Sequence, residues 1–346
     1  MAKILSVIIP TYNMEKYLDY CLSSLIVDNG LETLEVLVIN DGSKDSSLDI
    51  ARRYEAKCPY VFRVIDKENG NYGSCVNRGL KEAQGKYVKI LDADDSYDTE
   101  TFEEYLQFLQ NTDADLVVSN FYIVNEEREI TKCVDYDLPN DKVCTFDEVG
   151  GLKAFDDMEM HAVTYKRNIF DGMNYHQTEG ISYTDQQWIF EPITGVTSVA
   201  HFPKHVYKYL VGRQGQTMAP AVMARSRAHL QKCCLDMADS LQLRESHLTP
   251  SHIDYLNRRI TRMAKSIYIE SLKVIDSDNK NALIAFDNNL REANPVFYGR
   301  LADSCGRFSY IHFWRRHQNW PCVLFRLVMN IALSLKTKTK IFNVNG

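Results

Sequence analysis

The 346-residue sequence has few features that would indicate a disulfide framework, a zinc site or a membrane span. Its nine cysteines are odd in number and scattered, none form a Cys-x-x-Cys pair, and only Cys233 and Cys234 are adjacent. This pattern is typical of a reducing compartment. The apolar run at residues 4–9 is far shorter than the ~20 residues of a membrane span, and no signal-peptide cleavage pattern follows it. We therefore expect a cytoplasmic protein.

An excess of positive charge is also lacking. The 40 Lys and Arg residues face 46 Asp and Glu residues, a net charge of −6, which disfavours a general nucleic-acid binder. The Gly-rich stretch at residues 69–74 matches neither the Walker loop nor Gly-x-Gly-x-x-Gly. ATP hydrolysis by a P-loop enzyme and nicotinamide-dependent oxidation therefore lose support. The hydrophobic share of 45% and the charged share of 25% are those of an ordinary globular protein.

Up to about residue 125, short apolar runs alternate with helical patterns. Strands are predicted at residues 5–9, 34–39, 62–65, 87–91 and 114–118, and helices at 15–26, 45–57, 74–83 and 99–109. This alternation predicts an α/β fold with a mostly parallel sheet covered on both faces. Residues 126–215 look irregular apart from short strand-like pieces such as residues 206–211, and a helical period follows, with Thr249-Pro250 as a helix start. We predict a sheet domain at residues 1–217 and a helical domain at 218–346.

Polar residues gather where three of these predicted strands end. The ends read Pro10-Thr11-Tyr12-Asn13, Asn40-Asp41-Gly42-Ser43 and Asp92-Ala93-Asp94-Asp95. In an open α/β sheet, ligands bind beyond the carboxyl ends of the strands, so these residues should converge on one crevice.

The pair Asp92 and Asp94 is the most specific of these features. Two carboxylates one residue apart after a buried strand can reach both a divalent cation and a ribose, and Mg²⁺ or Mn²⁺ would complete its shell with phosphate oxygens. A turn followed by a helix N-cap is the structural alternative. Asp41 could likewise accept a base N–H or only form a tight turn, while Tyr12 offers a stacking face.

Four stretches, at residues 6–13, 38–45, 69–79 and 85–95, resemble the motifs of family 2 glycosyltransferases and occur in the same order. The resemblance covers roughly the first 125 residues. It implies an inverting enzyme with a GT-A type nucleotide-sugar domain. It also implies a nucleotide-diphosphate-sugar donor, usually a UDP-sugar, and Mg²⁺ or Mn²⁺ as cofactor.

The resemblance also assigns roles to individual residues. It implies that Asp41 binds the uracil ring, that Asp92 faces the ribose or donor sugar, and that Asp94 is the principal metal ligand. The implied nucleotide-sugar pocket consists of Pro10, Thr11, Tyr12, Asn13, Asp41, Gly42, Asn71, Asn77, Asp92 and Ala93. Many family members have Arg where this sequence has Val76, so the usual Arg contact is not assumed.

Two later stretches, at residues 179–188 and 212–217, resemble a bacterial subgroup of the same family. They suggest Asp185 as the base that takes the acceptor proton, with Glu179 as a weaker competitor. Asp185 could instead be a helix N-cap. Arg213 could hold diphosphate oxygens or lie in a surface turn. His161, His201 and His205 lie near the expected site, and whether one of them completes the metal shell is left open.

The C-terminal stretch differs from the rest of the chain in charge. Residues 300–346 contain eight Lys and Arg residues against one Asp, with aromatic residues interleaved and an apolar run at 323–333. A basic amphipathic end can lie on an anionic membrane surface, here the inner face of the membrane. A docked helix or a contact between copies in a homo-oligomer explains the pattern equally well.

Taken together, the sequence predicts a hexosyl- or N-acetylhexosaminyltransferase. It would move sugar from a UDP-sugar, or another nucleotide-sugar, to a glycan or lipid-linked acceptor in cell-surface polysaccharide or glycoconjugate synthesis. A catalytically silent nucleotide-sugar-binding protein is the main alternative. A sugar-phosphate nucleotidyltransferase is less favoured, because no Gly-rich loop with Arg and Lys follows the first strand.

Overall fold

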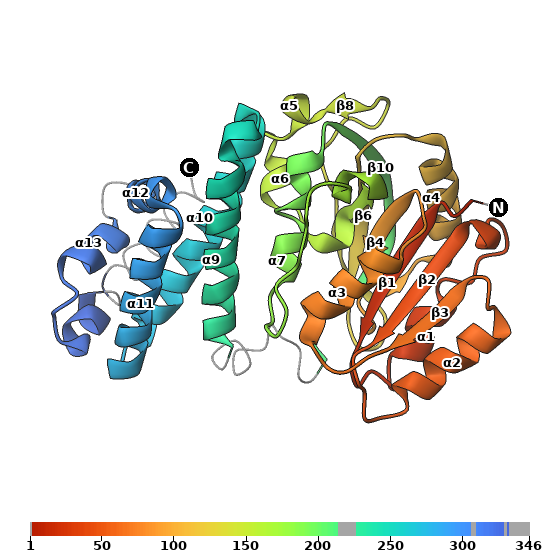
Figure 1. Ribbon diagram of the computed structural model, residues 1–346, viewed down its shortest axis with the longest axis horizontal. Coiled ribbons are helices and arrows are strands. Elements are labelled where there is room, and N and C mark those ends of the chain that lie inside the picture. Colours follow the sequence, from red (N-terminus) through yellow and green to blue (C-terminus); the bar gives the residue numbers. More distant parts are fainter. Residues whose placement is uncertain (1, 214–225, 306–308, 329–330, 332–346) are drawn as a thin grey trace. The chain divides into compact units, whose positions relative to one another are not determined.

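The computed structural model describes residues 2–213, 226–305, 309–328 and 331 (Figure 1). The chain divides into two compact units. The first comprises residues 1–229 and 248–255, and the second comprises residues 230–247 and 256–346. The expected domain division at residues 217 and 218 lies outside the described residues and stays a prediction.

The first unit contains one sheet with helices around it. Its strands are β1 (Leu5–Thr11), β2 (Leu34–Asn40), β3 (Phe62–Asp66), β4 (Tyr87–Ile90), β5 (Ser96–Tyr97), β6 (Leu116–Val124), β7 (Ile130–Val134), β8 (Cys144–Thr145), β9 (Val163–Lys166) and β10 (Ser198–Leu210). Its α-helices are α1 (Leu18–Ser23), α2 (Ser47–Lys57), α3 (Asn71–Glu82), α4 (Thr99–Asn111), α5 (Phe146–Val149), α6 (Lys153–Asp156) and α7 (Asp185–Trp188). Short 3-10 turns occur at η1 (Leu31–Thr33), η2 (Met160–Ala162), η3 (Arg167–Phe170) and η4 (Pro192–Gly195).

The strand order is β3-β2-β1-β4-β9-β6-β10-β5, with β7 paired to β6 and β8 to β10. The pairings β2–β3, β1–β2, β1–β4 and β6–β10 are parallel, and β1–β2, β2–β3 and β6–β10 are the longest ladders. Shorter antiparallel pairings join β9 to β4 and β6, and add β5, β7 and β8. The sheet is thus mixed but mostly parallel, which confirms the predicted fold class.

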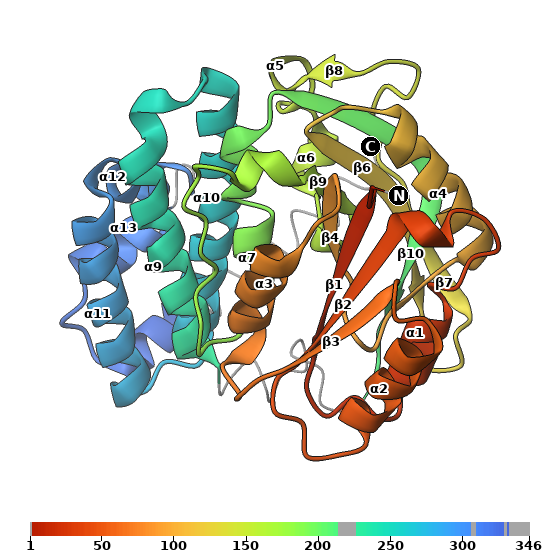
Figure 2. The same ribbon diagram turned by 45° about the vertical axis from the view of Figure 1, so that its right-hand side comes forward.

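The parallel half of the sheet is covered on both faces. The chain runs from β1 to β2 to β3 in one direction and then returns to β4 on the other side of β1. Right-handed crossovers therefore put α1 and α2 on one face and α3 on the other. Figure 2 shows the four strands between α3 and this pair of helices. On the α3 face, Gly79 lies so close to Ile8 that a Cβ would come within 2.4 Å of it.

Helix α3 begins earlier than its sequence suggests. The expected start was Ser74, after a flexible Gly-rich stretch, but the first helical residue is Asn71. Gly70 and Gly73 have low helix propensity, so the local sequence favours a loop. Tertiary contact overrides that preference. A Cβ on Gly73 would lie 2.1 Å from the carbonyl oxygen of Thr178, so only glycine lets the helix approach this loop so closely.

The sequence did not predict most of the strands in the antiparallel part of the sheet. The region taken as irregular contains β7, β8 and β9, and only the last part of the 13-residue strand β10 was expected. Strand β9 has four residues and pairs with β4 and β6, both far away in the sequence. A strand so short gives too little alternation to be recognised by its period.

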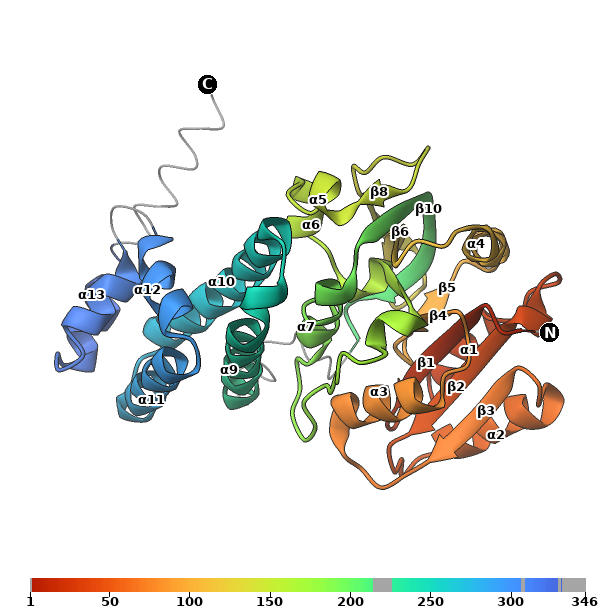
Figure 3. The ribbon, with the colours of Figure 1, turned by 45° about the horizontal axis from the view of Figure 1, so that its top comes forward.

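The second unit is helical in its described residues. It contains most of α9 (Arg227–Arg244), η5 (Glu245–His247), most of α10 (Pro250–Lys273), α11 (Ser277–Ala293), α12 (Pro295–Asp303) and α13 (Tyr310–Arg316). The predicted helix start at Thr249-Pro250 is confirmed. Helix α11 packs against α12, and α12 against α13 (Figure 3). Among the described helices, none combines the length and apolar character needed to cross a bilayer.

Candidate functional site

The carboxyl ends of β1 and β2 are tied together by hydrogen bonds. The Asp41 N–H donates to the Thr11 carbonyl oxygen at 2.8 Å, and the Asn13 N–H donates to Ser43 Oγ at 3.1 Å. Asn13 and Gly42 have φ values of 54° and 70°, the left-handed conformation that favours Asn and Gly. Two of the predicted polar strand ends therefore form one continuous edge.

Asp41 is buried at this edge, 3% exposed, and is balanced by a cation. Its Oδ1 accepts a hydrogen bond from Lys67 Nζ at 2.5 Å and another from the Gly70 N–H at 2.9 Å. Lys67 Nζ also donates to Ser74 Oγ in the first turn of α3, at 2.8 Å. Lys67 carried no motif that would have identified it from the sequence.

The other residues expected around the nucleotide differ in what they offer. Tyr12 is 47% exposed and presents its ring to solvent, while Asn71 is exposed at the start of α3 with a φ of 67°. Thr11 is buried, and its hydroxyl donates to the Ile9 carbonyl oxygen at 3.1 Å. Pro10 continues the β1 ladder beside Ile39. Tyr12 and Asn71 are thus available to a ligand through their side chains.

The turn after β4 brings three carboxylates together. The Tyr72 hydroxyl of α3 donates to Asp92 Oδ1 at 2.8 Å. Asp95 is buried and accepts hydrogen bonds from the Tyr207 hydroxyl at 2.5 Å and the Leu210 N–H at 2.7 Å. Asp94 forms an ion pair with Arg213. Ala93, which lies between Asp92 and Asp94 in the sequence, is buried and offers no polar side chain to a ligand.

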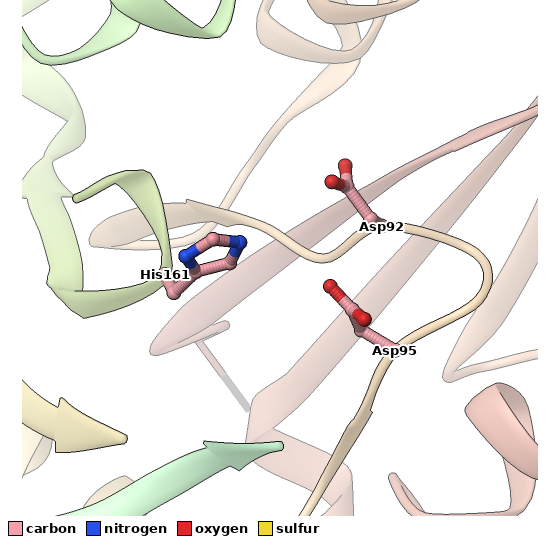
Figure 4. A group of neighbouring side chains, drawn as sticks. All are labelled: Asp92, Asp95 and His161. Carbon is pink, nitrogen blue, oxygen red and sulfur yellow. The ribbon is translucent and has the colours of Figure 1, made fainter. Parts of the chain in front are cut away.

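His161 faces this acidic turn from η2. Single ligand atoms of Asp92, Asp95 and His161 all lie within 4.8 Å of one another, and Figure 4 shows one ring nitrogen of His161 turned toward the two carboxylates. The ring stacks on Tyr209 at 4.1 Å between centroids. Lys89, fully buried in β4, donates to the carbonyl oxygens of His161 and Val163 at 2.7 and 3.1 Å, so β4 fixes the position of this turn.

Burial and mutual repulsion disfavour ionisation of these carboxylates. Burial raises the pKa of Asp92 to about 6, and the nearby Asp94 and Asp185 carboxylates add to the rise. Burial also raises the pKa of Asp95, with Asp94 and Asp92 contributing. An added positive charge would reverse this trend, because an opposite charge favours the ionised form.

The donor set fits a hard divalent cation. Carboxylate oxygens suit Mg²⁺ and Mn²⁺, and imidazole nitrogen is a usual ligand for transition metals. The buried Nδ1 of His161 has no hydrogen-bond partner among the described residues, and Glu159 Oε2 lies 3.3 Å from it. Asp94, the predicted principal ligand, is instead paired with Arg213. Its role as a ligand stays a prediction, and Asp95 was not among the residues selected from the sequence.

Asp185 approaches the acidic turn from α7. It is the first residue of that short helix, and the N-cap position belongs to Thr184, so the alternative of Asp185 as N-cap is wrong. Its carboxylate raises the pKa of both Tyr72 and Asp92, after burial and the nearer Asp neighbours. Gln186 Nε2 donates to Asp185 Oδ2 at 3.0 Å. The predicted base and the predicted donor site therefore share one electrostatic environment.

Asn77, predicted to contact the nucleotide, holds the loop that leads to α7. Its Oδ1 accepts from the Gln177 N–H at 2.8 Å, and its Nδ2 donates to the Gln177 carbonyl oxygen at 2.8 Å. Nδ2 also donates to Glu179 Oε1 at 2.9 Å. These contacts occupy the amide of Asn77 and tie Glu179, the weaker base candidate, to α3.

Two of the three histidines left open have structural partners. His201 contacts the Leu138 carbonyl oxygen at 3.1 Å and Asn120 Oδ1 at 3.2 Å. His205 lies 3.1 Å from an Asp135 carboxylate oxygen and stacks on Tyr122. His161 is the one that joins the acidic turn. Trp188 is fully buried against Tyr165 and Phe170, as expected of a core residue.

Known proteins share both the motifs and the fold. Residues 6–136 match the family described as glycosyl transferase family 2. The N-terminal part of the chain is therefore similar to this family. The matched segment contains β1 to β6 and the acidic turn, so it includes most of the site described above.

Bacterial proteins are among the curated relatives of this chain. The uncharacterized glycosyltransferase YibD of Escherichia coli is 30% identical over 217 residues, which cover 59% of this chain and 60% of YibD. The minor teichoic acid biosynthesis protein GgaB of Bacillus subtilis is 40% identical over 104 residues, 30% of this chain and 12% of GgaB. The chain thus spans less than two thirds of either relative.

The fold extends beyond the matched segment. A crystal structure of S. aureus TarS 1-349 in complex with UDP-GlcNAc has a TM-score of 0.70 and covers 96% of this chain and 92% of the TarS chain. The sequence identity is 19%, so the likeness concerns the fold. The likeness to TarS extends over the helical region after the sheet, in agreement with the predicted architecture.

Proposed function

We propose that this chain is an inverting glycosyltransferase that moves a sugar from a UDP-sugar to a hydroxyl group of a glycan or lipid-linked acceptor. The observation that carries the proposal is the meeting of three carboxylates, His161 and Asp185 at the carboxyl end of β4. The similarity of residues 6–136 to family 2 and the relation to GgaB support a role in making a cell-surface polymer.

The donor would bind along the edge formed by β1, β2 and α3. Tyr12 offers an exposed ring for stacking on the base, and the Asp41 carboxylate is already oriented by Lys67 and Gly70. Asp92 would face the ribose or the sugar, since its position is fixed from α3 by Tyr72. These residues would bind the donor and would take no part in breaking or forming bonds.

The metal would be held by Asp94 together with the cluster of Asp92, Asp95 and His161. Mg²⁺ or Mn²⁺, when bound, supplies positive charge for the leaving diphosphate. Arg213 pairs with Asp94 in the structure. A second positive charge at Asp94 would weaken that pair, and the guanidinium could then contact diphosphate oxygens, for which its planar geometry is suited.

Asp185 would act as the general base. Its carboxylate accepts the proton of the acceptor hydroxyl while that oxygen attacks the anomeric carbon from the face opposite the diphosphate. A bond from the acceptor oxygen to the anomeric carbon forms, the bond to the diphosphate oxygen breaks, and UDP leaves. The anomeric configuration is inverted. The pairing with Gln186 would orient the carboxylate.

The first test is thermal stabilisation by a panel of nucleotides and nucleotide sugars, with and without Mn²⁺ or Mg²⁺. UDP-GlcNAc is the first donor to test, because TarS was solved with it. A ligand at a hundredfold excess over its Kd stabilises the folded state by about 2.7 kcal/mol. The proposal predicts a metal-dependent shift with UDP or a UDP-sugar that Asp94→Ala abolishes. No shift with any nucleotide diphosphate would contradict it.

The second test separates an enzyme from a silent binding protein. Once a donor is known, Asp185→Asn should leave donor binding unchanged and reduce transfer about 10²–10⁴-fold, the usual contribution of a general base. Glu179→Gln is the matched control and should retain most activity. Equal rates for the wild type and Asp185→Asn would rule out Asp185 as the base. Pyrophosphate release from UTP and a sugar phosphate would instead indicate a nucleotidyltransferase.

A further inference from the structure

A short helical segment after α13 exposes an unusual number of large aliphatic side chains. Residues 322–328 and 331 are helical, and Val323, Leu324, Leu327 and Ile331 are exposed at 69%, 39%, 58% and 53%. We call these four residues the aliphatic face. Val323, Leu327 and Ile331 are spaced four residues apart, so they lie on one side of the helix. Contiguous apolar surface of this kind marks an interaction site.

One aromatic side chain holds this segment to the helical unit. Phe325 is 1% exposed and packs on Trp314, with ring centroids 5.1 Å apart, and on Phe313 at 5.9 Å. The Arg326 guanidinium donates to the Ile275 carbonyl oxygen at 2.9 Å. The helix is thus anchored through Phe325 and Arg326, and the aliphatic face points away from the residues that anchor it.

The sequence that carries the aliphatic face has charge of a single sign. From Ser304 to Gly346 the sequence contains no Asp or Glu and seven Lys and Arg residues, while the whole chain has a net charge of −6. Arg315 is taken up by an ion pair with buried Asp287 at 2.8 Å, whereas Arg316 is exposed. This stretch of sequence is therefore basic in a chain that is acidic overall.

We propose that the aliphatic face binds a membrane surface that carries anionic lipid headgroups. Aliphatic side chains would enter the boundary between headgroups and acyl chains, and the basic residues would contact the headgroups. A second copy of the chain is a poorer occupant, because its equally basic segment would be brought next to this one. Nucleic acid is disfavoured because the exposed residues are aliphatic, and stacking needs aromatic rings.

The test is co-sedimentation of the full chain with phosphatidylcholine vesicles that do or do not contain phosphatidylglycerol. We expect binding only to the anionic vesicles. The double variant Val323→Glu/Leu327→Glu should reduce the partition coefficient at least about tenfold, since it removes apolar contact and adds negative charge. Leu243→Glu is the matched control, because Leu243 in α9 is 72% exposed and lies outside the basic segment.

A salt series and a mass measurement complete the test. The Debye length falls from about 10 Å at 0.1 M salt to about 3 Å at 1 M, so binding should weaken markedly over that range. Equal binding by the wild type and the double variant, or no binding to anionic vesicles, would overturn the proposal. A lipid-free dimer that the double variant dissociates would identify a second copy as the occupant and would also overturn it. UDP binding, measured in parallel, should be the same in all variants, which keeps this test separate from that of the proposed function.

Discussion

At the end of β2, buried Asp41 faces the ammonium of Lys67, whereas at the end of β4 three carboxylates lie near two guanidinium groups, of which Arg213 pairs with Asp94 and Arg128 donates to the Asp94 carbonyl oxygen. Both sites lie at the carboxyl ends of parallel strands on either side of β1, and the first turn of α3 contacts both through Ser74 and Tyr72. The chain therefore supplies its own counter-charge at one site and leaves negative charge in excess at the other.

The difference shows where an external cation is needed. A buried carboxylate that has a partner charge and hydrogen bonds needs no external cation. It can therefore take part in ligand recognition. A cluster with excess negative charge favours protonation or cation binding, which agrees with the raised pKa of Asp92. Recognition is thus expected at Asp41 and metal-assisted chemistry at the acidic turn.

The largest effect is expected from Asp94→Ala. If the acidic turn supplies the metal ligand, transfer with Mn²⁺ should fall about 10³-fold, because stabilisation of the leaving diphosphate is worth several kcal/mol. The rate with excess donor measures this loss. A rate within a few-fold of that of the wild type would mean that Asp94 is not needed for metal-assisted chemistry. The acidic turn would then not differ from the Asp41 site in this respect.

Next in size is the effect of Lys67→Met on stability. It leaves Asp41 buried without its cation, which we expect to reduce the free energy of unfolding by ~3 kcal/mol. Urea unfolding measures this change. Arg52→Met is the matched control, because the Arg52–Glu55 pair is half exposed at Arg52 and should contribute at most about 1 kcal/mol. Equal losses in the two variants would mean that Asp41 does not depend on Lys67.

A smaller effect is expected on how the free energy of unfolding changes with pH. The pKa of Asp92 is about 6 in the folded chain, above its ordinary value of ~3.9, so the folded state holds the proton more tightly between these values. Stability due to this group is therefore present at low pH and is lost as pH rises from about 4 to 6, by roughly 2–3 kcal/mol. Unfolding of metal-free wild type and Asp92→Asn across this range should show it. A difference between the two proteins that does not change with pH would contradict the assignment.

The smallest effect is expected from Ser74→Ala. The Ser74 hydroxyl accepts one hydrogen bond from Lys67, so its loss should cost about 1 kcal/mol. The same variant should raise the Kd for UDP only slightly, because Lys67 keeps its contact with Asp41. A loss as large as that in Lys67→Met would show that Ser74, and not the ion pair, maintains the site.

The parallel half of the sheet could be predicted because its signals are local. Apolar runs for β1 and β2, followed by polar residues such as Asp41, identify both the strands and their ligand-facing ends. Asp92 was selected from its place after a buried strand and Asp185 through motif resemblance, and the structure brings them into one electrostatic environment.

The remaining parts of the site depend on pairings between distant residues. His161 reaches the acidic turn because β9 inserts between β4 and β6, and its own sequence neighbours do not indicate this. Lys67 precedes the Gly-rich stretch at residues 69–74 and Tyr72 lies within it; the stretch resembles a loop, so the roles of both residues became visible only with the early start of α3. Asp95 is held by Tyr207 of β10, 112 residues away.

The course of α10 limits how this protein can be divided for study. Residues 248–255, including the first turns of that helix, belong to the first unit, where His252 Nε2 lies 2.9 Å from the Val196 carbonyl oxygen and Tyr255 donates to the Ile189 carbonyl oxygen at 2.6 Å. Residues 230–247 come earlier in the chain but belong to the second unit. A single cut therefore cannot yield either unit complete, and an expression fragment that ends at residue 217 would lack part of its own core. The shortest fragment that retains the whole first unit ends after Tyr255.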